Sequence, residues 1–343
     1  MVFSPFTGVE NSKSCVTFAA ALPYREDTIS FVWLFKASRI TMSNCDPTCL
    51  ITYQDPTMKI AIERVFYSSR TRHRLCMWHI MKNVPKKVGP TLTQNEDFMS
   101  EFYNCAWRKH TEPREFDSIL QKYDLMNNTW LQHMFQIRQD WIPSYYRNMP
   151  MSRVMRTTSR SESENNFFRH FTTPHVTLLE FWMRYQSVMD SQRHKQSKLL
   201  SESKNSKPQR KTPLDLEKHA SELYTQTVFY EFQNELLAAC FDCGLHSMIA
   251  EEDVHIVTLI DHKHNRKMHR VRYHLDNNRA ECSCKMYQRE GIPCRHILLV
   301  IKEKGLKSLP TTHVKTRWTK AAMSMPMFDL GGNLIEDTTK WRL

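Results

Sequence analysis

The feature that most constrains this chain is a group of three cysteines and one histidine close together in the sequence. Cys282 and Cys284 lie two residues apart, and Cys294 and His296 follow after nine intervening residues. Residues two apart in an extended chain point the same way, so the first pair can bind one ion, while the second pair opens a helix predicted at residues 297–301. Four such ligands fill the tetrahedral shell of zinc and leave no open position, which predicts a structural zinc site. The alternative is a chance grouping of buried thiols and a surface imidazole.

The segment before these four residues has the period-two pattern of two β-strands. Apolar or β-branched residues alternate first at Val254, Ile256, Thr258 and Ile260, and then at Val271, Tyr273 and Leu275. Arg270, Arg272 and His274 alternate with the second set, so we predict a hairpin with a basic outward face. A module this small has little core of its own, and zinc-finger peptides gain on the order of 10 kcal/mol of folding free energy from the metal.

Positive charge is concentrated in the same part of the chain. The formal net charge is +12, and residues 262–320 hold fifteen Lys and Arg against four acidic residues. A concentrated positive surface attracts polyanions, of which nucleic acid is the commonest. We therefore predict DNA as a partner, contacted by Arg270, Arg272, Arg289 and Arg295. Two alternatives stay open: a solvated basic surface, and a zinc-dependent module that binds proteins and not DNA.

Hydropathy and cysteine usage indicate whether the chain spans a membrane, is secreted or forms disulfides. No window approaches the roughly 18 consecutive apolar residues of a membrane span, and residues 1–13 lack the pattern of a secretory signal. We expect no membrane partner. Ten cysteines without a framework of regular spacings favour reduced thiols and metal ligands over disulfides.

The rest of the chain predicts alternating strands and helices, followed by a mostly helical region. A hairpin is expected over residues 6–22, a helix over 28–41, a strand over 49–52, and a helix that begins at Pro56 with Asp55 as its N-cap. Residues 72–156 show little strand signal. Further helices are expected over 177–200 and 214–240, joined by an exposed linker at 201–213, whose basic residues are a nuclear localisation patch or a plain solvated loop.

The spacing C-x-C-x9-C-x-H resembles the SWIM zinc finger, and other segments extend the resemblance. FSPFTGVENSKSCVTF, ITYQDPTMKIAIERVF, HRLCMWHIMKNVP, TTSRSESENNFF, TQTVFYEFQNEL and LPTTHVKTRWTKAA occur in this order. Together they resemble the plant far-red-impaired-response family, regulators derived from Mutator-like transposases.

This resemblance implies an α+β fold with a partial RNase H-like transposase core, a large helical insertion and a small ββα SWIM zinc finger. The implied division is 1–86 for the partial core, 87–250 for the insertion and the remainder of the core, 251–306 for the finger and 307–343 for a tail. It also implies a nuclear location and a DNA-associated role in transcription, with other transcription regulators as partners.

The acidic residues of an active transposase are incompletely present. Such enzymes use three carboxylates to hold two divalent ions. The resemblance implies that the first acidic position would fall on a strand before Met1, that Tyr53 stands at the second and that Glu162 stands at the third. A phenol cannot replace a carboxylate as a magnesium ligand, so we expect no catalysis. The alternative is an active Mutator-like transposase or a fragment of one.

Two further clusters leave metal binding open. Cys76 and His79 form a C-x-x-H pair near His73, which fits either a second metal or a packed helix with a buried thiol. Cys240 and Cys243 have the spacing of a redox or zinc pair, but a helix that ends before Gly244 explains them at least as well.

Overall fold

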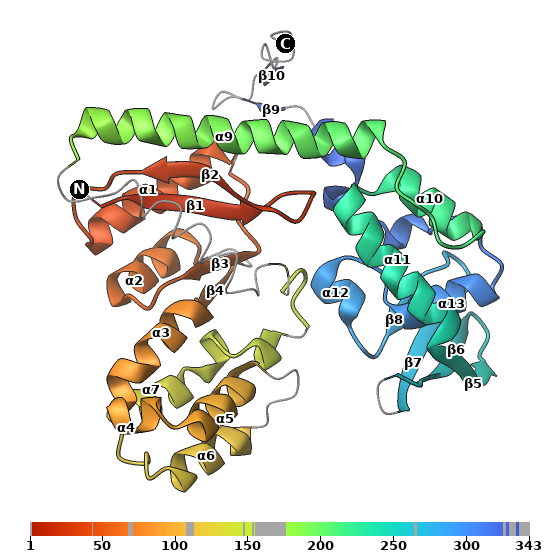
Figure 1. Ribbon diagram of the computed structural model, residues 1–343, viewed down its shortest axis with the longest axis horizontal. Helices are drawn as coiled ribbons and strands as arrows, with labels where there is room; N and C mark the ends of the chain where they lie inside the picture. The colour runs from red at the N-terminus through yellow and green to blue at the C-terminus, as the bar shows by residue number, and fades with distance from the viewer. Residues whose placement is uncertain are drawn as a thin grey trace.

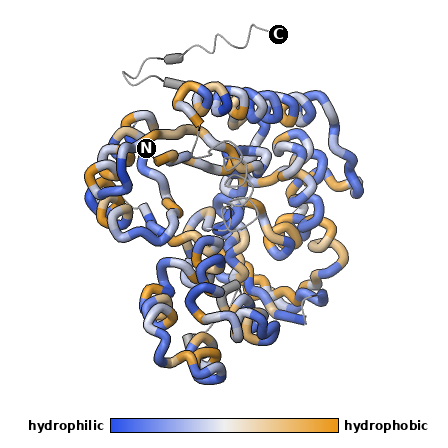
Figure 2. Tube along the Cα trace, turned by 60° about the vertical axis from the view of Figure 1, so that its left-hand side comes forward, coloured by the Kyte–Doolittle hydropathy of each residue, from blue (hydrophilic) through white to orange (hydrophobic). Residues whose placement is uncertain are grey.

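The protein is built from small β-sheets flanked by helices, which confirms the α+β class. A computed structural model describes residues 2–42, 44–67, 71–107, 113–146, 148–152, 154, 176–263 and 266–324, together with the short strands β9 (Met327–Phe328) and β10 (Leu334–Ile335) (Figure 1). Apolar and polar residues alternate along most helices (Figure 2), as expected for helices with one buried face. No helix among these residues is long and apolar enough to cross a membrane.

The first part of the chain contains two separate two-stranded sheets. β1 (Ser4–Val9) pairs antiparallel with β2 (Cys15–Ala21), and β3 (Cys49–Thr52) pairs parallel with β4 (Arg72–Leu75). Helix α1 (Thr28–Thr41) joins the two sheets and α2 (Pro56–Val65) connects β3 to β4. These elements confirm the predicted hairpin, helix, strand and helix. The RNase H-like arrangement is not established by two small sheets and stays a prediction.

Side-chain caps fix where these first helices begin. Asp27 accepts a hydrogen bond from Ser30 N at 2.8 Å, and Asp55 accepts one from Met58 N at 2.7 Å. The predicted N-cap role of Asp55 is therefore confirmed. The apolar faces of α1 and α2 pack together in one cluster, which consists of Phe31, Leu34, Phe35, Met58, Ala61, Ile62, Val65 and Phe66.

The next part is helical and has its own apolar core. It comprises α3 (Met77–Val88), α4 (Pro90–Thr93), α5 (Glu96–Trp107), α6 (Pro113–Lys122), α7 (Thr129–Gln136), η1 (Arg138–Asp140) and η2 (Pro143–Tyr146). Its core includes Phe98, Phe102, Phe116, Leu131, Met134 and Trp141. Strand β4 lies at the start of residues 72–156, the segment expected to be mostly helical. It was not expected, because its sequence is polar. Its Arg74 is nevertheless buried, 3.9 Å from the centre of the Tyr146 ring.

A single long helix, α9 (Leu178–Asn205), runs past the first hairpin towards the C-terminal part of the chain (Figure 1). A capping box between Thr177 and Glu180 starts it. The helix continues five residues beyond the expected end at Leu200, because its last turns are held: Ser203 is buried and accepts a hydrogen bond from Gln226 N. The linker that follows, from residue 206, is mostly exposed.

The C-terminal lobe, residues 214–324, combines helices with an antiparallel sheet. Its elements are α10 (Asp215–Leu223), α11 (Gln226–Phe241), β5 (Cys243–Ala250), β6 (Val254–Asp261), β7 (Lys267–His274), β8 (Ala280–Cys282), α12 (Met286–Glu290), α13 (Arg295–Glu303), η3 (Thr311–His313), η4 (Thr316–Trp318) and η5 (Lys320–Ser324). The strand order is β5-β6-β7-β8. Helices α11 and α13 pack together, and their apolar faces share one core with the sheet.

Two features of this sheet differ from the sequence prediction. Strands β5 and β8 were not expected, because β5 has no clean alternation and β8 has three residues. In β6 the buried side chains are Val257, Leu259 and Asp261, whereas Ile256 and Thr258 pair with Arg272 and Arg270 on the other face. The predicted facing of β6 is therefore wrong. Both faces of this strand carry apolar side chains, so the sequence pattern alone does not show which set is buried.

The tip of the first hairpin is fastened into the C-terminal lobe. Val9 belongs to the core of that lobe, and its carbonyl oxygen accepts a hydrogen bond from Arg317. Asn11 donates to Thr319 O at 3.2 Å and accepts from the Thr225 hydroxyl at 2.8 Å. Lys13 forms an ion pair with Glu231. The first hairpin and the C-terminal lobe are thus in direct contact.

Candidate metal centre

Cys282 and Cys284 are presented by the end of β8 and the turn that follows it. Cys282 is the last residue of β8 and pairs with Val271 of β7. The turn is fixed on both sides: Ser283 N donates to Arg270 O at 2.9 Å, and Lys285 N donates to Cys282 O at 3.0 Å. Lys285 takes the left-handed conformation with φ of 57°, which reverses the chain directly after Cys284.

Cys294 and His296 are presented by the start of α13. Cys294 is the N-cap residue of that helix, and its carbonyl oxygen accepts a hydrogen bond from Leu298 N at 2.9 Å. The helix buries its apolar side chains against the sheet, so its first turn is held in place. The helix predicted after Cys294 is confirmed, and His296 lies within its first turn.

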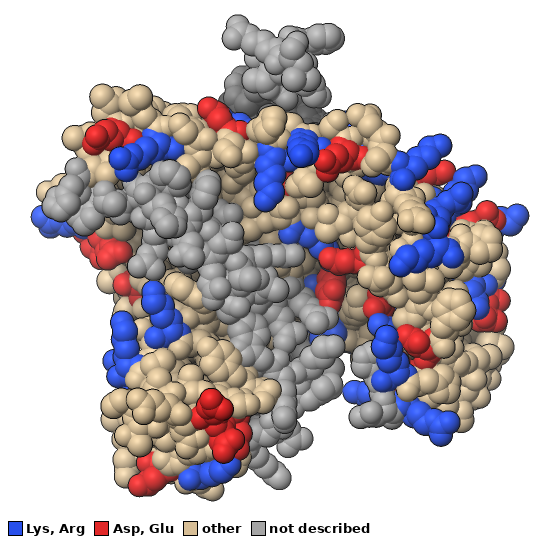
Figure 3. Space-filling model, viewed as in Figure 1, with Lys and Arg blue, Asp and Glu red and all other residues tan. Residues whose placement is uncertain are grey.

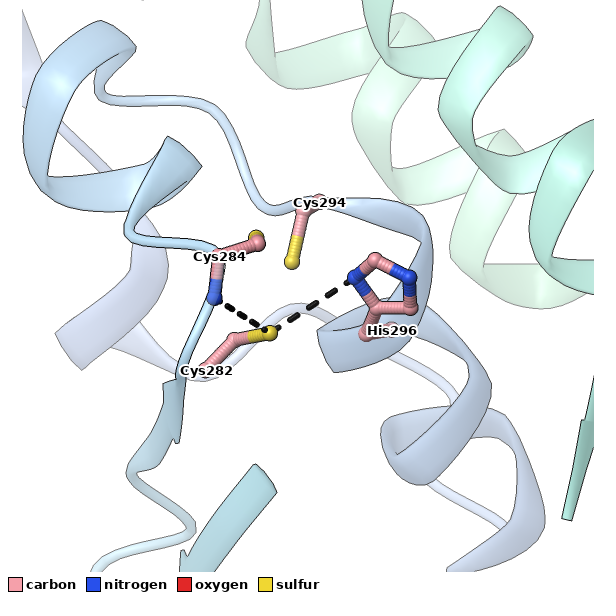
Figure 4. A group of neighbouring side chains, drawn as sticks. All are labelled: Cys282, Cys284, Cys294 and His296. Carbon is pink, nitrogen blue, oxygen red and sulfur yellow. Dashed lines mark hydrogen bonds between the residues drawn. The ribbon is translucent and has the colours of Figure 1, made fainter. Parts of the chain in front are cut away.

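The four side chains converge as the sequence predicted (Figure 4). One nitrogen or sulfur atom from each of Cys282, Cys284, Cys294 and His296 lies within 4.8 Å of all the others. The His296 ring turns Nδ1 towards the sulfurs, 3.6 Å from Cys282 Sγ, and the Cys284 N–H donates to the same sulfur at 3.4 Å. Zinc bonds of about 2.0–2.3 Å place tetrahedral ligand atoms roughly 3–4 Å apart. The donor types and their spacing therefore fit zinc.

Burial and charge suit a metal better than three free thiols. Cys282, Cys294 and His296 are each at most 4% exposed. Hydrogen bonds from the thiols of Cys282 and Cys294 lower the pKa of Cys284, whereas burial raises the pKa of Cys294 well above its ordinary value. The Cys284 thiol therefore loses its proton more readily than the Cys294 thiol, so the negative charge of the cluster lies at Cys284. A bound cation would displace the remaining thiol protons.

A second group of potential ligands lies on the far side of His296. Atoms of Cys243, Asp261 and His296 also lie within 4.8 Å of one another. Burial raises the pKa of Cys243 to about 12, and the nearby Asp261 carboxylate adds to the effect. Cys240 does not belong to this group. Asp261 is not predicted from the sequence, because one carboxylate at the end of an apolar strand carries no distinctive signal.

The other sequence candidates do not form a comparable cluster. Within the described ranges, no group of three or more Cys, His, Asp or Glu ligands includes Cys76 or His79. Tyr53 follows β3 and its hydroxyl donates to Glu26 at 3.2 Å; burial raises its pKa, and the Glu26 and Asp55 charges add to this. Glu162 lies outside the described residues.

The predicted basic face is only partly exposed. Arg270 and Arg272 are exposed on the outward side of β7, as expected. Arg289 is 8% exposed and donates to the carbonyl oxygens of Cys284 and Lys285, at 2.9 and 3.2 Å. Arg295 donates to both carboxylate oxygens of Glu235. Arg289 and Arg295 are therefore corrected from DNA contacts to structural residues.

Lys and Arg side chains do not form one continuous patch on the face that Figure 3 shows. Acidic side chains lie between them over the C-terminal lobe and α9. On this face the positive charge of the C-terminal lobe is therefore interrupted by acidic side chains. Arg270 and Arg272 on β7 are exposed within the same lobe as the four-residue cluster.

Comparisons with known proteins match the two ends of the chain to two domain families. Residues 1–83 match the MULE transposase domain, and residues 269–305 match the SWIM zinc finger. No solved structure matches the chain. The two domain matches, together with the Cys and His cluster, therefore define the class: a Mutator-like transposase-derived protein that carries a SWIM zinc finger.

Three plant relatives narrow this class. The chain is 35% identical over 334 residues to Protein FAR1-RELATED SEQUENCE 5 of Arabidopsis thaliana, covering 95% of this chain and 41% of the relative. Protein FAR1-RELATED SEQUENCE 9 of the same plant is 32% identical, with 93% and 58% covered. Protein FAR-RED IMPAIRED RESPONSE 1, also from that plant, is 28% identical, with 96% and 40% covered. The chain belongs to this FAR1-related family and spans between 40% and 58% of the length of these three relatives.

Proposed function

We propose that the chain is a zinc-binding, transposase-derived nuclear regulator of transcription that associates with DNA and has no catalytic activity. The observation that carries the proposal is the buried cluster of Cys282, Cys284, Cys294 and His296. It joins β8 to α13, and the neighbouring strand β7 presents exposed Arg270 and Arg272. All four positions are occupied by protein ligands, so the metal would hold the lobe together and would not act on a substrate.

The proposed domain boundaries are those predicted from the sequence. Residues 1–86 would be a partial RNase H-like core, residues 87–250 its insertion and remainder, residues 251–306 the finger and residues 307–343 a tail. The match to the MULE transposase domain supports the first of these. Other transcription regulators would be partners, and a fluorescent fusion of the chain should accumulate in plant nuclei.

The surroundings of β3 support the absence of catalysis. Tyr53 stands where the family resemblance places a carboxylate, and its hydroxyl is bonded to Glu26. The nearby Asp55 is occupied as a cap, with hydrogen bonds from Met58 N and from the Thr57 hydroxyl at 2.6 Å. A two-metal mechanism needs carboxylates free to bind the ions. A DNA-cleavage assay with magnesium on terminal-repeat DNA, beside Tyr53→Asp, tests this; cleavage by the unmodified chain would favour the transposase alternative.

Metal analysis of the purified chain tests the zinc centre. We expect one zinc ion per chain, lost in Cys294→Ser and in His296→Ala. Cys45→Ser is the matched control, since Cys45 is an exposed free cysteine outside the cluster, and it should keep the metal. A wild-type chain without stoichiometric zinc would overturn the assignment.

Salt dependence tests DNA association through β7. Binding to duplex DNA should weaken steeply between about 50 and 200 mM salt, because phosphate contacts release counterions. The double variant Arg270→Ala/Arg272→Ala should bind more weakly with a shallower salt slope. Arg25→Ala/Lys36→Ala, which removes two exposed charges at the other end of the chain, should not change the slope. No DNA retention at either salt concentration would favour the protein-binding alternative.

A further inference from the structure

We propose that Asp261 is a positioning residue for the zinc centre: it accepts the Nε2–H of His296 and so holds the ring with Nδ1 turned to the metal. The inference rests on the zinc binding proposed above. Neither the spacing of the four ligands nor the family match points to this carboxylate, which lies 21 residues before the first ligand in the sequence.

The two ring nitrogens of His296 face different groups. Nδ1 lies 3.6 Å from Cys282 Sγ, whereas Nε2 lies 3.7 Å from Asp261 Oδ2 (Figure 4 shows Nε2 turned away from the sulfurs). Metal binding at Nδ1 leaves the proton on Nε2. The arrangement therefore separates the two functions of the ring, one nitrogen for the ion and the other for a carboxylate.

The Nε2 atom needs an acceptor because it is buried. It is inaccessible to solvent and has no hydrogen-bond partner at direct bonding distance. A buried donor left unpaired is destabilising. Asp261 Oδ2 is a charged acceptor in front of it, and the side chains of both residues are at most 5% exposed. A movement of roughly 0.8 Å would bring the pair to ordinary hydrogen-bond length.

Asp261 is itself held in place from two directions. Its Oδ1 accepts a hydrogen bond from Lys263 N at 3.1 Å, and its Oδ2 lies 3.7 Å from Arg295 Nη1. Arg295 donates from Nη2 to Glu235 Oε1 at 2.8 Å and from Nε to Oε2 at 3.2 Å. The positive guanidinium compensates the buried carboxylate, and it is anchored to α11 through Glu235.

A second ring limits rotation of His296 about its other axis. The His269 ring from β7 lies 4.0 Å from the His296 ring, centre to centre, with an angle of 33° between their planes. Packing of this kind fixes the plane of the imidazole, while the carboxylate fixes which edge points to the metal. Together they supply the orientation that ligand histidines commonly receive from neighbouring groups.

The same contacts argue against a second cation bound by Cys243, Asp261 and His296. The guanidinium of Arg295 already lies beside the Asp261 carboxylate, and a second ion there would be repelled by it. Binding at Nε2 would also require His296 to lose its remaining proton. The group on this side of the ring therefore supports one metal site and does not form another.

Removing the carboxylate should weaken the metal site without removing a ligand. Neighbours of this kind typically change metal affinity by 10–100-fold. We expect Asp261→Ala to lower zinc affinity of the full chain about 10–100-fold in competition with a chromogenic chelator. Asp261→Asn should lose less, because its amide oxygen still accepts a hydrogen bond. Asp253→Asn, an exposed carboxylate just before the same strand, is the matched control and should match the wild type.

A spectroscopic readout separates positioning from general destabilisation. In chains with ¹⁵N-labelled histidine and bound zinc, the Nε2–H of His296 should be visible and protected from water in the wild type. It should exchange rapidly in Asp261→Ala and regain partial protection in Asp261→Asn. The resonance is assigned by its loss in His296→Cys, which keeps a fourth ligand.

The outcomes distinguish the two proposals. A wild-type chain that binds no zinc would overturn the zinc centre itself. Stoichiometric zinc in the wild type, with unchanged affinity and an unchanged Nε2–H signal in both Asp261 variants, would overturn the role of Asp261 alone. A ring that binds the metal through Nε2 would also overturn it. If Asp261→Ala fails to fold, Asp261→Asn carries the test, since its side chain has nearly the same size.

Discussion

Trp318 donates its indole N–H to the carbonyl oxygen of Glu290 at 2.8 Å. Glu290 ends α12, in the segment between the second and third cluster ligands. The Trp318 carbonyl accepts a hydrogen bond from Thr225 N at the start of α11, and Lys13 of the hairpin tip lies 5.3 Å from the centre of its ring. One fully buried residue therefore contacts three parts of the chain: the segment between Cys284 and Cys294, which we call the ligand loop, the start of α11 and the N-terminal hairpin.

Gly291→Ala should be strongly destabilising. Gly291 has φ of +74°, and an added Cβ would lie 2.6 Å from Trp318 Nε1. Positive φ costs an L-residue about 1–2 kcal/mol, and overpacking adds about 1–3 kcal/mol. Gly305→Ala is the control, because Gly305 has φ of +70° and open space around its Cβ position. Chemical denaturation of zinc-loaded protein should place the Gly291 variant below the Gly305 variant; equal losses would mean that the contact with Trp318 does not matter.

Removing the metal should loosen the N-terminal hairpin as well as the ligand loop. Loss of zinc frees the segment that holds Glu290, and Trp318 links that segment to the hairpin tip. Hydrogen exchange measured with and without a chelator should accelerate at the amides of Glu10 and Lys13, which close the turn of the hairpin. The amide of Cys76, bonded to Thr52 O beside the parallel sheet, serves as the control. Exchange that rises only in residues 282–296 would contradict this connection.

The ion pair between Arg295 and Glu235 should contribute measurably to stability. The two side chains are 17% and 14% exposed, and they form two side-chain hydrogen bonds. A double-mutant cycle with Arg295→Met and Glu235→Gln should give a coupling free energy of about 1–3 kcal/mol. The same cycle at Arg193 and Asp190, which are 65% and 68% exposed, should give less than about 0.5 kcal/mol. Equal couplings would show that burial adds nothing here.

Stability should fall as the pH drops below the ordinary pKa of histidine, and His313 should account for part of the loss. Burial lowers the pKa of His313 from 6.5 to about 4, and its Nε2 accepts a hydrogen bond from Ala280 N at 2.8 Å. The unfolded chain therefore binds this proton first, so the contribution is complete above pH 6.5 and is lost as the pH falls towards 4.

The full shift corresponds to about 3 kcal/mol. His313→Gln keeps an acceptor for Ala280 N but cannot be protonated in this range. The difference in unfolding free energy between wild type and variant should therefore change between pH 6.5 and 4.5, whereas zinc loss affects both proteins. A constant difference across that range would contradict the prediction.

The sequence predicts best where one local signal dominates. The hairpin, α1, β3 and α2 followed from turn residues, apolar spacing and the Asp55 cap, and the four cluster residues followed from donor type and spacing alone. These signals are local, because the interactions that fix each element lie within a few residues of one another.

The sequence predicts least where a residue is defined by distant partners. β4 is polar, and its Arg74 is buried because Tyr146 packs on it from the helical region. Arg289 and Arg295 look like surface charges in the sequence, yet each is paired with groups that folding brings close. Asp261 acquires its position only when β6 lies beside α13. No spacing rule encodes such contacts.

The hairpin tip packs into the C-terminal lobe, and this contact limits how the chain can be divided into fragments. A deletion that retained only the C-terminal lobe, residues 214–324, would remove Val9 and Lys13 from their partners Arg317 and Glu231. It would also uncover the apolar side of α11. Fragments made for biochemistry should therefore keep both the β1–β2 hairpin and the C-terminal lobe, or replace the hairpin with other residues that cover the apolar side of α11.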